Sequence, residues 1–316
     1  MSKTVLITGS NGLCGSALTE EINRGHLDYD FYFATRNDAD LVNPNDVKAL
    51  FDKVRPNVVI HTAAKVGGIG GNTEMHADFF YNNILMNTNI IKNCIDFNID
   101  KLLAFSSVCV FPDDLSLLEE SKMHQGPVFE SNFAYGYAKR MVDVYIRAAK
   151  LQHGVKNYCS IIPGNIFGKH DMFSIDHGHI IPALMHKLYL AKQNNTEFIV
   201  WGDGKSLREF IYVNDLAKVL LRLLAMPEIP ERIIVSGEKE LSIQEVAKFL
   251  VEVSDFKGIT KWDTSKPNGQ RNRPSSKKAF NSLIPDFQYS DIKESLKSTW
   301  DWFINNYPNV RCKYND

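Results

Sequence analysis

The chain has 316 residues, with 36 Lys and Arg against 37 Asp and Glu, so its formal net charge is -1. This balance argues against a whole-chain nucleic-acid or anionic-membrane binder, because such binding draws on an excess of basic residues. The five cysteines are widely spaced and odd in number, which argues against a disulfide framework or a zinc site and favours a reducing compartment. We expect no metal, no membrane span and a cytoplasmic location.

Strands and helices alternate in the first half. Apolar segments rich in β-branched and aromatic residues predict strands over 4–8, 29–36, 57–62, 102–111 and 158–167. Amphipathic spacing predicts helices over 13–24, 46–53, 75–97 and 134–152. This alternation predicts an α/β fold of the Rossmann type, with a doubly wound parallel sheet covered on both faces.

The second half is more mixed. Short strands are expected over 198–201, 209–213 and 232–235, and helices over 180–192, 215–226, 242–253 and 290–306. Ser242 and Glu245 have the spacing of a capping box that begins the third of these helices. We expect an NADP-binding domain over 1–170, a smaller mixed α/β substrate-binding domain over 171–316, and interleaving near 205–235.

A glycine-rich turn lies between the first strand and the first helix. Its glycines have GxxGxxG spacing, which lets the backbone approach a pyrophosphate at a helix N-terminus. In this strand–turn–helix context the motif predicts a dinucleotide site, whereas alone it could be only a tight turn. The expected cofactor-binding residues of this turn are Gly9, Asn11, Gly12, Leu13 and Gly15.

The end of the second strand indicates which dinucleotide is bound. Arg36 stands where an acidic residue would hydrogen-bond the ribose 2′-hydroxyl of NAD. An arginine can instead pair with a 2′-phosphate, so NADP(H) is the expected cofactor, although a solvated surface arginine is the alternative. At the third strand's end, Ala63, Ala64 and Lys65 are expected along the cofactor, with simple close packing as the alternative.

Tyr135 and Lys139 have the Tyr-x-x-x-Lys spacing that places both on one helix face. A nearby ammonium is expected to lower the tyrosine pKa, so that the phenol can exchange a proton with a carbonyl or alcohol. Ser107, at the end of the preceding strand, can hydrogen-bond the same substrate oxygen. With the glycine motif, this set resembles the extended short-chain dehydrogenase/reductase family, in which Ser, Tyr and Lys serve carbonyl reduction.

The residues after Ser107 separate the subfamilies. Sugar-nucleotide dehydratases carry an Asp-Glu pair there, whereas this chain has Val108 and Cys109. A thiol at this position could act as a base, although a cysteine in an apolar strand is more often inert. Dehydration is therefore poorly supported.

Five further segments resemble GDP-L-fucose synthases. They are Lys65–Ile69 (KVGGI), Asn165–Asp171 (NIFGKHD, with Lys169 for the usual Pro), Gly178–Leu184 (GHIIPAL), Val200–Gly202 and Arg208–Phe210. The resemblance implies Cys109 and His179 as base and acid for epimerisation, and adds Pro163 and His179 to the residues at the cofactor. For His179, a capping or surface role is the alternative.

The resemblance also implies how the substrate is held. Lys187, Arg208 and Arg273 are the candidates for a diphosphate, with solvated surface positions as the alternative for each. Trp201 is expected to pack on the guanine or the sugar, and Asn165 to hydrogen-bond the hexose. Several basic residues between Lys266 and Arg273 leave the register of that loop open.

The expected function is NADPH-dependent conversion of GDP-4-keto-6-deoxy-D-mannose to GDP-L-fucose, by 3,5-epimerisation and reduction at C4. The alternatives are another nucleotide-sugar epimerase or reductase of this fold, and a non-catalytic NADP-binding regulator. A homodimer through the helices at 75–97 and 134–152 is expected by resemblance alone.

Overall fold

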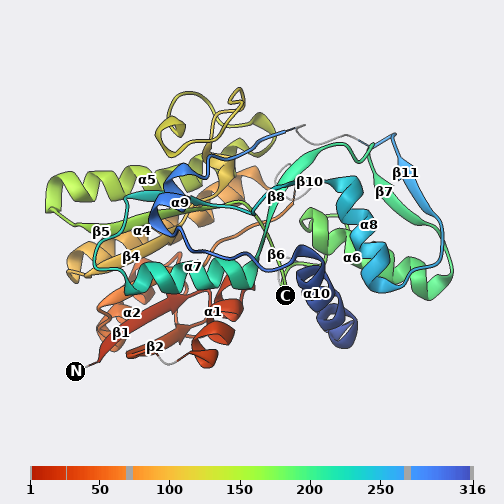
Figure 1. Ribbon diagram of the computed structural model, residues 1–316. Helices are drawn as coiled ribbons and strands as arrows, with labels where there is room; N and C mark the ends of the chain where they lie inside the picture. Colours follow the sequence, from red (N-terminus) through yellow and green to blue (C-terminus); the bar gives the residue numbers. More distant parts are fainter. Residues whose placement is uncertain (1, 26, 69–73, 267–271, 314–316) are drawn as a thin grey trace.

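The computed structural model describes residues 2–25, 27–68, 74–266 and 272–313. A six-stranded parallel sheet forms the larger lobe, with strand order β2-β1-β3-β4-β5-β9 (Figure 1). These strands are β1 (Lys3–Thr8), β2 (Tyr29–Ala34), β3 (Val58–His61), β4 (Lys101–Phe105), β5 (Asn157–Pro163) and β9 (Arg232–Val235). The predicted doubly wound parallel sheet is confirmed.

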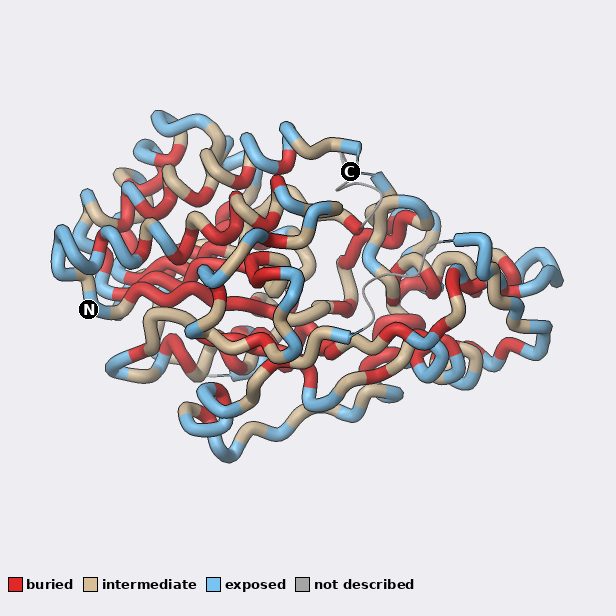
Figure 2. Tube along the Cα trace, turned by 90° about the horizontal axis from the view of Figure 1, so that it is seen from above, coloured by how far each residue is buried: buried red, intermediate tan, exposed pale blue. Residues whose placement is uncertain are grey.

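Helices cover both faces of this sheet because successive strand side chains point to opposite sides. Val5 and Ile7 of β1 pack in one core with helices α1 (Leu13–Arg24) and α7 (Val213–Ala225). Leu6 packs in the other core, with α2 (Pro44–Val54), α4 (His76–Asp96) and α5 (Phe133–His153). Buried residues therefore concentrate along the strands between two helical layers (Figure 2).

The smaller lobe has two short sheets. β10 (Glu240–Ser242), β8 (Leu207–Tyr212) and β6 (Asn165–Phe167) form one, and β11 (Thr260–Asp263) pairs with β7 (Phe198–Trp201) in the other. Its core is shared by the helices α6 (Ile180–Asn194), α8 (Ile243–Ser254) and α10 (Ile292–Asn306). The predicted capping box at Ser242 and Glu245 opens α8.

The chain passes between the lobes more than once. It leaves the large sheet after β5 and enters the small one at β6, yet α7 packs on α1 and β9 returns to pair with β5. The helix α9 (Lys278–Leu283), which comes later in the chain, likewise returns to the larger lobe and packs against β9. Residues 205–235 thus contribute to both lobes.

Two predicted strands of the large sheet end earlier than expected, and both end near residues that the sequence predicts to be functional. The expected strand over 102–111 ends at Phe105, because Ser107 caps a short 3-10 turn, η1 (Val108–Val110), by accepting the Cys109 N–H at 3.2 Å. The expected strand over 158–167 breaks at Gly164, where a side chain would lie 2.9 Å from Ser236 Cβ. Cys109 is therefore on a turn beyond the sheet edge, where its thiol is partly exposed.

Among the described residues, no helix has both the length and the hydrophobicity to cross a membrane.

Candidate active site

One large cavity, of about 1780 Å³, lies beyond the carboxyl ends of the parallel strands and is lined by residues of both lobes. Ligands of open α/β sheets bind at this edge. Of the predicted site residues, all but Gly15 line the cavity: Gly9, Asn11, Gly12, Leu13, Arg36, Ala63, Ala64, Lys65, Ser107, Cys109, Tyr135, Lys139, Pro163, Asn165, His179, Lys187, Trp201, Arg208 and Arg273. Segments far apart in the sequence thus meet at one place.

The glycine-rich turn is shaped by close backbone packing. Gly9 has φ +73°, and a Cβ there would lie 2.8 Å from the backbone of Ala63. Gly12 is the N-cap of α1 and lines the cavity, so the unpaired N–H groups of the first turn of that helix lie beside the cavity. Gly15 is buried beneath them, where a Cβ would lie 2.3 Å from the Gly9 carbonyl oxygen. Gly15 does not line the cavity in this structure, and its predicted cofactor contact stays a prediction.

The residues at this end fit a dinucleotide. Ser10 Oγ donates to the Ala34 carbonyl oxygen at 2.9 Å, which ties the turn to the end of β2. Arg36 follows that strand end, exposed and lining the same cavity. A helix N-terminus suits a pyrophosphate, and the arginine suits a further phosphate. Lys65 also lines the cavity, and its ammonium pairs with Asp78 at 3.5 Å.

Lys139 is a buried cation at the centre of the site. It is 1% exposed, and its Nζ donates to the Phe105 carbonyl oxygen at 2.7 Å, at the end of β4. Burial disfavours the charged form and lowers the pKa of Lys139 to about 7. The lysine can therefore gain or lose a proton near neutral pH.

Tyr135 lies one turn before Lys139 on α5. Burial raises its pKa well above the usual value, and a hydrogen bond with Ser107 opposes that rise only in part. The predicted lowering of the tyrosine pKa is therefore wrong for this structure, because desolvation outweighs any effect of the Lys139 ammonium. A phenol that holds its proton at neutral pH is suited to act as an acid.

Gly136, the residue after Tyr135 on α5, lets the η1 turn that carries Cys109 pack against this helix. A Cβ on Gly136 would lie 2.7 Å from the Cys109 carbonyl oxygen, so the helix can contact the η1 turn only without a side chain there. The charge of a Cys109 thiolate would in turn raise the pKa of Tyr135. The thiol of Cys109 and the phenol of Tyr135 are therefore close enough for the charge of one to affect the proton affinity of the other.

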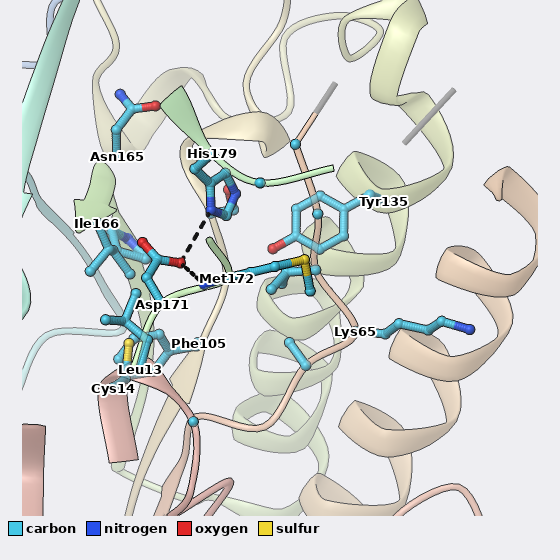
Figure 3. A pocket seen from close by; sticks show the side chains of 18 of the residues that line it. Leu13, Cys14, Lys65, Phe105, Tyr135, Asn165, Ile166, Asp171, Met172 and His179 are labelled. Atoms are coloured by element: carbon cyan, nitrogen blue, oxygen red, sulfur yellow. Dashed lines mark hydrogen bonds and ion pairs between the residues drawn. The ribbon is translucent and has the colours of Figure 1, made fainter. Parts of the chain in front are cut away.

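His179 faces the same pocket as Tyr135 (Figure 3). It is the N-cap residue of α6, and its side chain is 46% exposed. The preceding Gly178 packs against Gly68, where a Cβ would lie 2.2 Å from the Gly178 carbonyl oxygen. The predicted KVGGI and GHIIPAL segments are thus in contact through their glycines; Ile69 of the first lies outside the described residues.

The far end of the cavity carries three cations. Lys187 Nζ lies 3.4 Å from the centre of the Trp201 ring, and burial lowers the pKa of Lys187 to about 8. Arg208 and Arg273 are both half-buried; burial lowers the pKa of each, and the charge of Arg273 lowers the pKa of Arg208 further. Such desolvated like charges suit an anionic ligand. Residues 267–271, within the loop whose register was open, lie outside the described residues.

Several lining residues were not predicted. Asp171 belongs to the NIFGKHD segment but had no assigned role, and Arg311 comes from the C-terminal segment. The NIFGKHD match could have pointed to Asp171, because the matching segment includes this residue. In the structure, the Asp171 side chain is buried and lies 3.9 Å from His179. Nothing in the spacing of the sequence could have placed Arg311 at the cavity.

The fold and this site define the class: an NAD(P)-dependent enzyme with the Ser-Tyr-Lys set of carbonyl reduction. The NAD dependent epimerase/dehydratase family model matches residues 5–236.

Comparison with known proteins narrows the class. A GDP-L-fucose synthase of Dictyostelium discoideum is 39% identical over 313 residues, which is 98% of either chain. A probable GDP-L-fucose synthase of Drosophila melanogaster is 37% identical over 320 residues, covering 98% of this chain and 99% of the relative. The crystal structure of a GDP-L-fucose synthetase from Naegleria fowleri bound to NADP matches with a TM-score of 0.92 and 39% identity, covering 98% of this chain and 95% of that one. The chain belongs to the GDP-L-fucose synthase family.

Proposed function

We propose that this chain converts GDP-4-keto-6-deoxy-D-mannose to GDP-L-fucose, by inverting C3 and C5 and then reducing the C4 ketone, with NADP(H) as its cofactor. The observation that carries the proposal is the meeting of two sets of residues in one cavity. Ser107, Tyr135 and Lys139 are suited to reduction, while Cys109 and His179 are suited to proton transfer. Family membership supports the same reaction.

Epimerisation depends on the acidity of the protons beside the ketone. Removing the proton from C3 or C5 gives an enolate whose charge rests on O4, where Ser107 and Tyr135 can donate hydrogen bonds. Cys109 takes each proton as a thiolate, and His179 returns one to the opposite face. Thiolates and imidazoles are both established proton-transfer groups in enzymes.

Reduction uses the protonated phenol. Bound NADPH would supply the hydrogen and the electron pair that reduce C4. Tyr135, which burial keeps protonated, donates its proton to O4, and Ser107 orients that oxygen. Lys139, with its pKa near 7, is placed to restore the tyrosine proton and to hold the nicotinamide ribose.

Two sets of cationic and polar residues hold the two anionic ligands. Arg36 binds the 2′-phosphate, and the turn at Gly9 and Gly12 binds the pyrophosphate of the cofactor. For the substrate, Lys187, Arg208 and Arg273 hold the diphosphate, while Trp201 packs on the guanine or sugar and Asn165 bonds the hexose. The exposed Trp201 ring, covered on one face by Lys187, supports this assignment.

Two single substitutions separate the chemical steps. Cys109→Ser should slow epimerisation about 100-fold or more, with unchanged folding and NADPH binding, because a hydroxyl is a far weaker base than a thiolate. Tyr135→Phe should impair reduction most. Product analysis by NMR and NADPH absorbance measure the two steps separately. Parent-like GDP-L-fucose formation by Cys109→Ser would remove the base assignment, and unimpaired reduction by Tyr135→Phe would remove the acid assignment.

We also propose that the chain forms a homodimer through α4 and α5. Val144 and Leu151 lie seven residues apart on one face of α5, 41% and 79% exposed, and Phe80 and Tyr81 are exposed on neighbouring α4. Exposed apolar side chains on one helix face, as at Val144 and Leu151, mark interaction surfaces. Val144→Lys together with Leu151→Lys should convert a dimer to a monomer in sedimentation analysis; a parent chain that sediments as a monomer contradicts the proposal.

We also propose a cytoplasmic location, because Cys14, Cys94, Cys109 and Cys159 are free thiols and a reducing compartment keeps thiols in that state.

A further inference from the structure

Asp171 is a buried carboxylate at the wall of the active-site cavity. It is 2% exposed, in the segment that joins β6 to α6. Its Oδ1 accepts the Met172 N–H at 2.7 Å, while its Oδ2 is buried and has no hydrogen-bond partner within the described part of the chain. An ionised group in such surroundings is costly unless a donor or a positive charge compensates it.

The imidazole of His179 is placed to provide that compensation. Its Nδ1 lies 3.9 Å from Asp171 Oδ1, and Figure 3 shows the ring directed toward the carboxylate on one side and the pocket on the other. The distance is that of an ion pair, and a small rotation of the exposed histidine would close it to a hydrogen bond.

The backbone between the two residues is anchored at several points. The Phe173 N–H donates to the Arg311 carbonyl oxygen at 2.8 Å, and the Gly178 N–H to the Ser174 carbonyl oxygen at 3.0 Å. From outside the segment, the Gly68 N–H donates to the His177 carbonyl oxygen at 2.7 Å. Asp171 and His179 are thus held at a fixed separation, as a device that orients a side chain requires.

We propose that Asp171 is a positioning residue for His179 in the epimerisation, an inference that rests on the proposed function. By accepting the Nδ1–H, the carboxylate fixes the tautomer and ring orientation and leaves Nε2 toward the substrate. Its negative charge also faces the positive charge that the ring carries before it donates a proton. In this role Asp171 acts through His179 and exchanges no proton itself.

The proton transfers balance with this arrangement. The Cys109 thiolate takes a proton from C3 or C5 and becomes a thiol, which leaves the enolate. The His179 imidazolium then gives its Nε2 proton to the opposite face of that carbon and becomes neutral, with Nδ1–H still donated to Asp171. A proton passing from Cys109 to His179 through water restores both groups before the next inversion.

Asp171→Asn is the test substitution, because the amide keeps an oxygen for the Met172 N–H but carries no charge. We expect deuterium incorporation at C3 and C5 in D₂O to slow by about 100-fold. Reverse oxidation of GDP-L-fucose by NADP⁺, which needs no epimerisation, should stay within about threefold of the parent rate. A merely structural role would lower both rates together.

Asp143→Asn is the matched control. Asp143 is also fully buried and also pairs with a histidine, His124 at 2.7 Å, but it lies outside the cavity lining. We expect this variant to lose stability while the ratio of the two rates stays unchanged. A ratio that changes equally in both variants would overturn the proposal.

A measurement on the parent protein tests the same inference without requiring any variant to turn over. Long-range ¹H–¹⁵N correlation NMR, with the His179 signals assigned through His179→Gln, reports which ring nitrogen carries the proton. We expect the neutral ring to be the Nδ1–H tautomer; the Nε2–H tautomer would overturn the inference. Failure of the parent chain to form GDP-L-fucose would instead overturn the proposed function, so the two failures are distinguishable.

Discussion

Gly68→Ala tests whether the packing of two glycine-containing segments positions His179. A Cβ at residue 68 would lie 2.2 Å from the Gly178 carbonyl oxygen and 3.2 Å from the His177 carbonyl oxygen. Cβ atoms essentially never come within about 3.0 Å of such an atom, so the contact must open by at least about 0.8 Å. Because both sides of the contact are backbone, this movement is transmitted to His179.

The expected loss of activity follows from the displacement of His179. A misplacement of about 1 Å at a catalytic group can cost about 100-fold in rate, so GDP-L-fucose formation should fall between about 10- and 100-fold. The overpacking itself should cost about 1–3 kcal/mol of unfolding free energy. Reverse oxidation of GDP-L-fucose, which depends on Tyr135 rather than His179, should fall much less.

The assay compares three rates: forward product formation, deuterium incorporation at C3 and C5, and reverse oxidation. Gly25→Ala is the matched control, because a Cβ there meets nothing closer than the Glu21 carbonyl oxygen at 3.7 Å. The reasoning is refuted if Gly68→Ala forms GDP-L-fucose at the parent rate with parent-like stability. It is equally refuted if both alanine variants lose the same activity.

Two further predictions concern charge. Lys139→Met should stabilise the cofactor-free protein by up to about 4 kcal/mol at pH 7, because burial lowers the pKa of Lys139 from 10.5 to about 7. Between these two pH values the lysine is protonated in the unfolded chain and neutral in the folded one. The stability that Lys139 costs the folded protein is therefore at its full value below pH 7 and fades toward pH 10.5. Urea unfolding at pH 7 and pH 10 measures the gain from Lys139→Met, and an equal gain at both would contradict the prediction. Arg36→Ala should weaken NADPH binding about 10- to 100-fold and leave NADH binding unchanged, since only NADPH has the 2′-phosphate. Parallel titrations with the two cofactors measure the difference, and an equal loss for both would remove Arg36 from that role.

Periodicity was sufficient to bound several helices and strands. The helix expected over 13–24 and the strands expected over 198–201 and 232–235 have those bounds in the structure. These segments are strongly patterned, and the short turns at their ends contain glycine or capping residues. The short strands β10 and β11 and the helix α9 were not predicted, because each has few apolar residues at the spacing of a strand or a helix.

The site shows where such prediction stops. Motif spacing could indicate that Tyr135 and Lys139 share a helix face, but not that desolvation raises the pKa of one and lowers that of the other. The β-branched and aromatic residues around Cys109 predict a continuous strand. In the structure that strand ends before Ser107, whose side chain caps a 3-10 turn by accepting the Cys109 N–H. Burial, and contacts between distant segments such as Gly68 with Gly178, arise only in the folded chain.

The central claim is that one cavity performs both epimerisation and reduction on the same keto-sugar. The most direct test supplies NADPH and GDP-4-keto-6-deoxy-D-mannose in D₂O and analyses the product by NMR. The claim predicts GDP-L-fucose that carries deuterium at both C3 and C5, with one NADPH oxidised for each product molecule. A C4-reduced sugar with unchanged configuration and no deuterium at those carbons would contradict it.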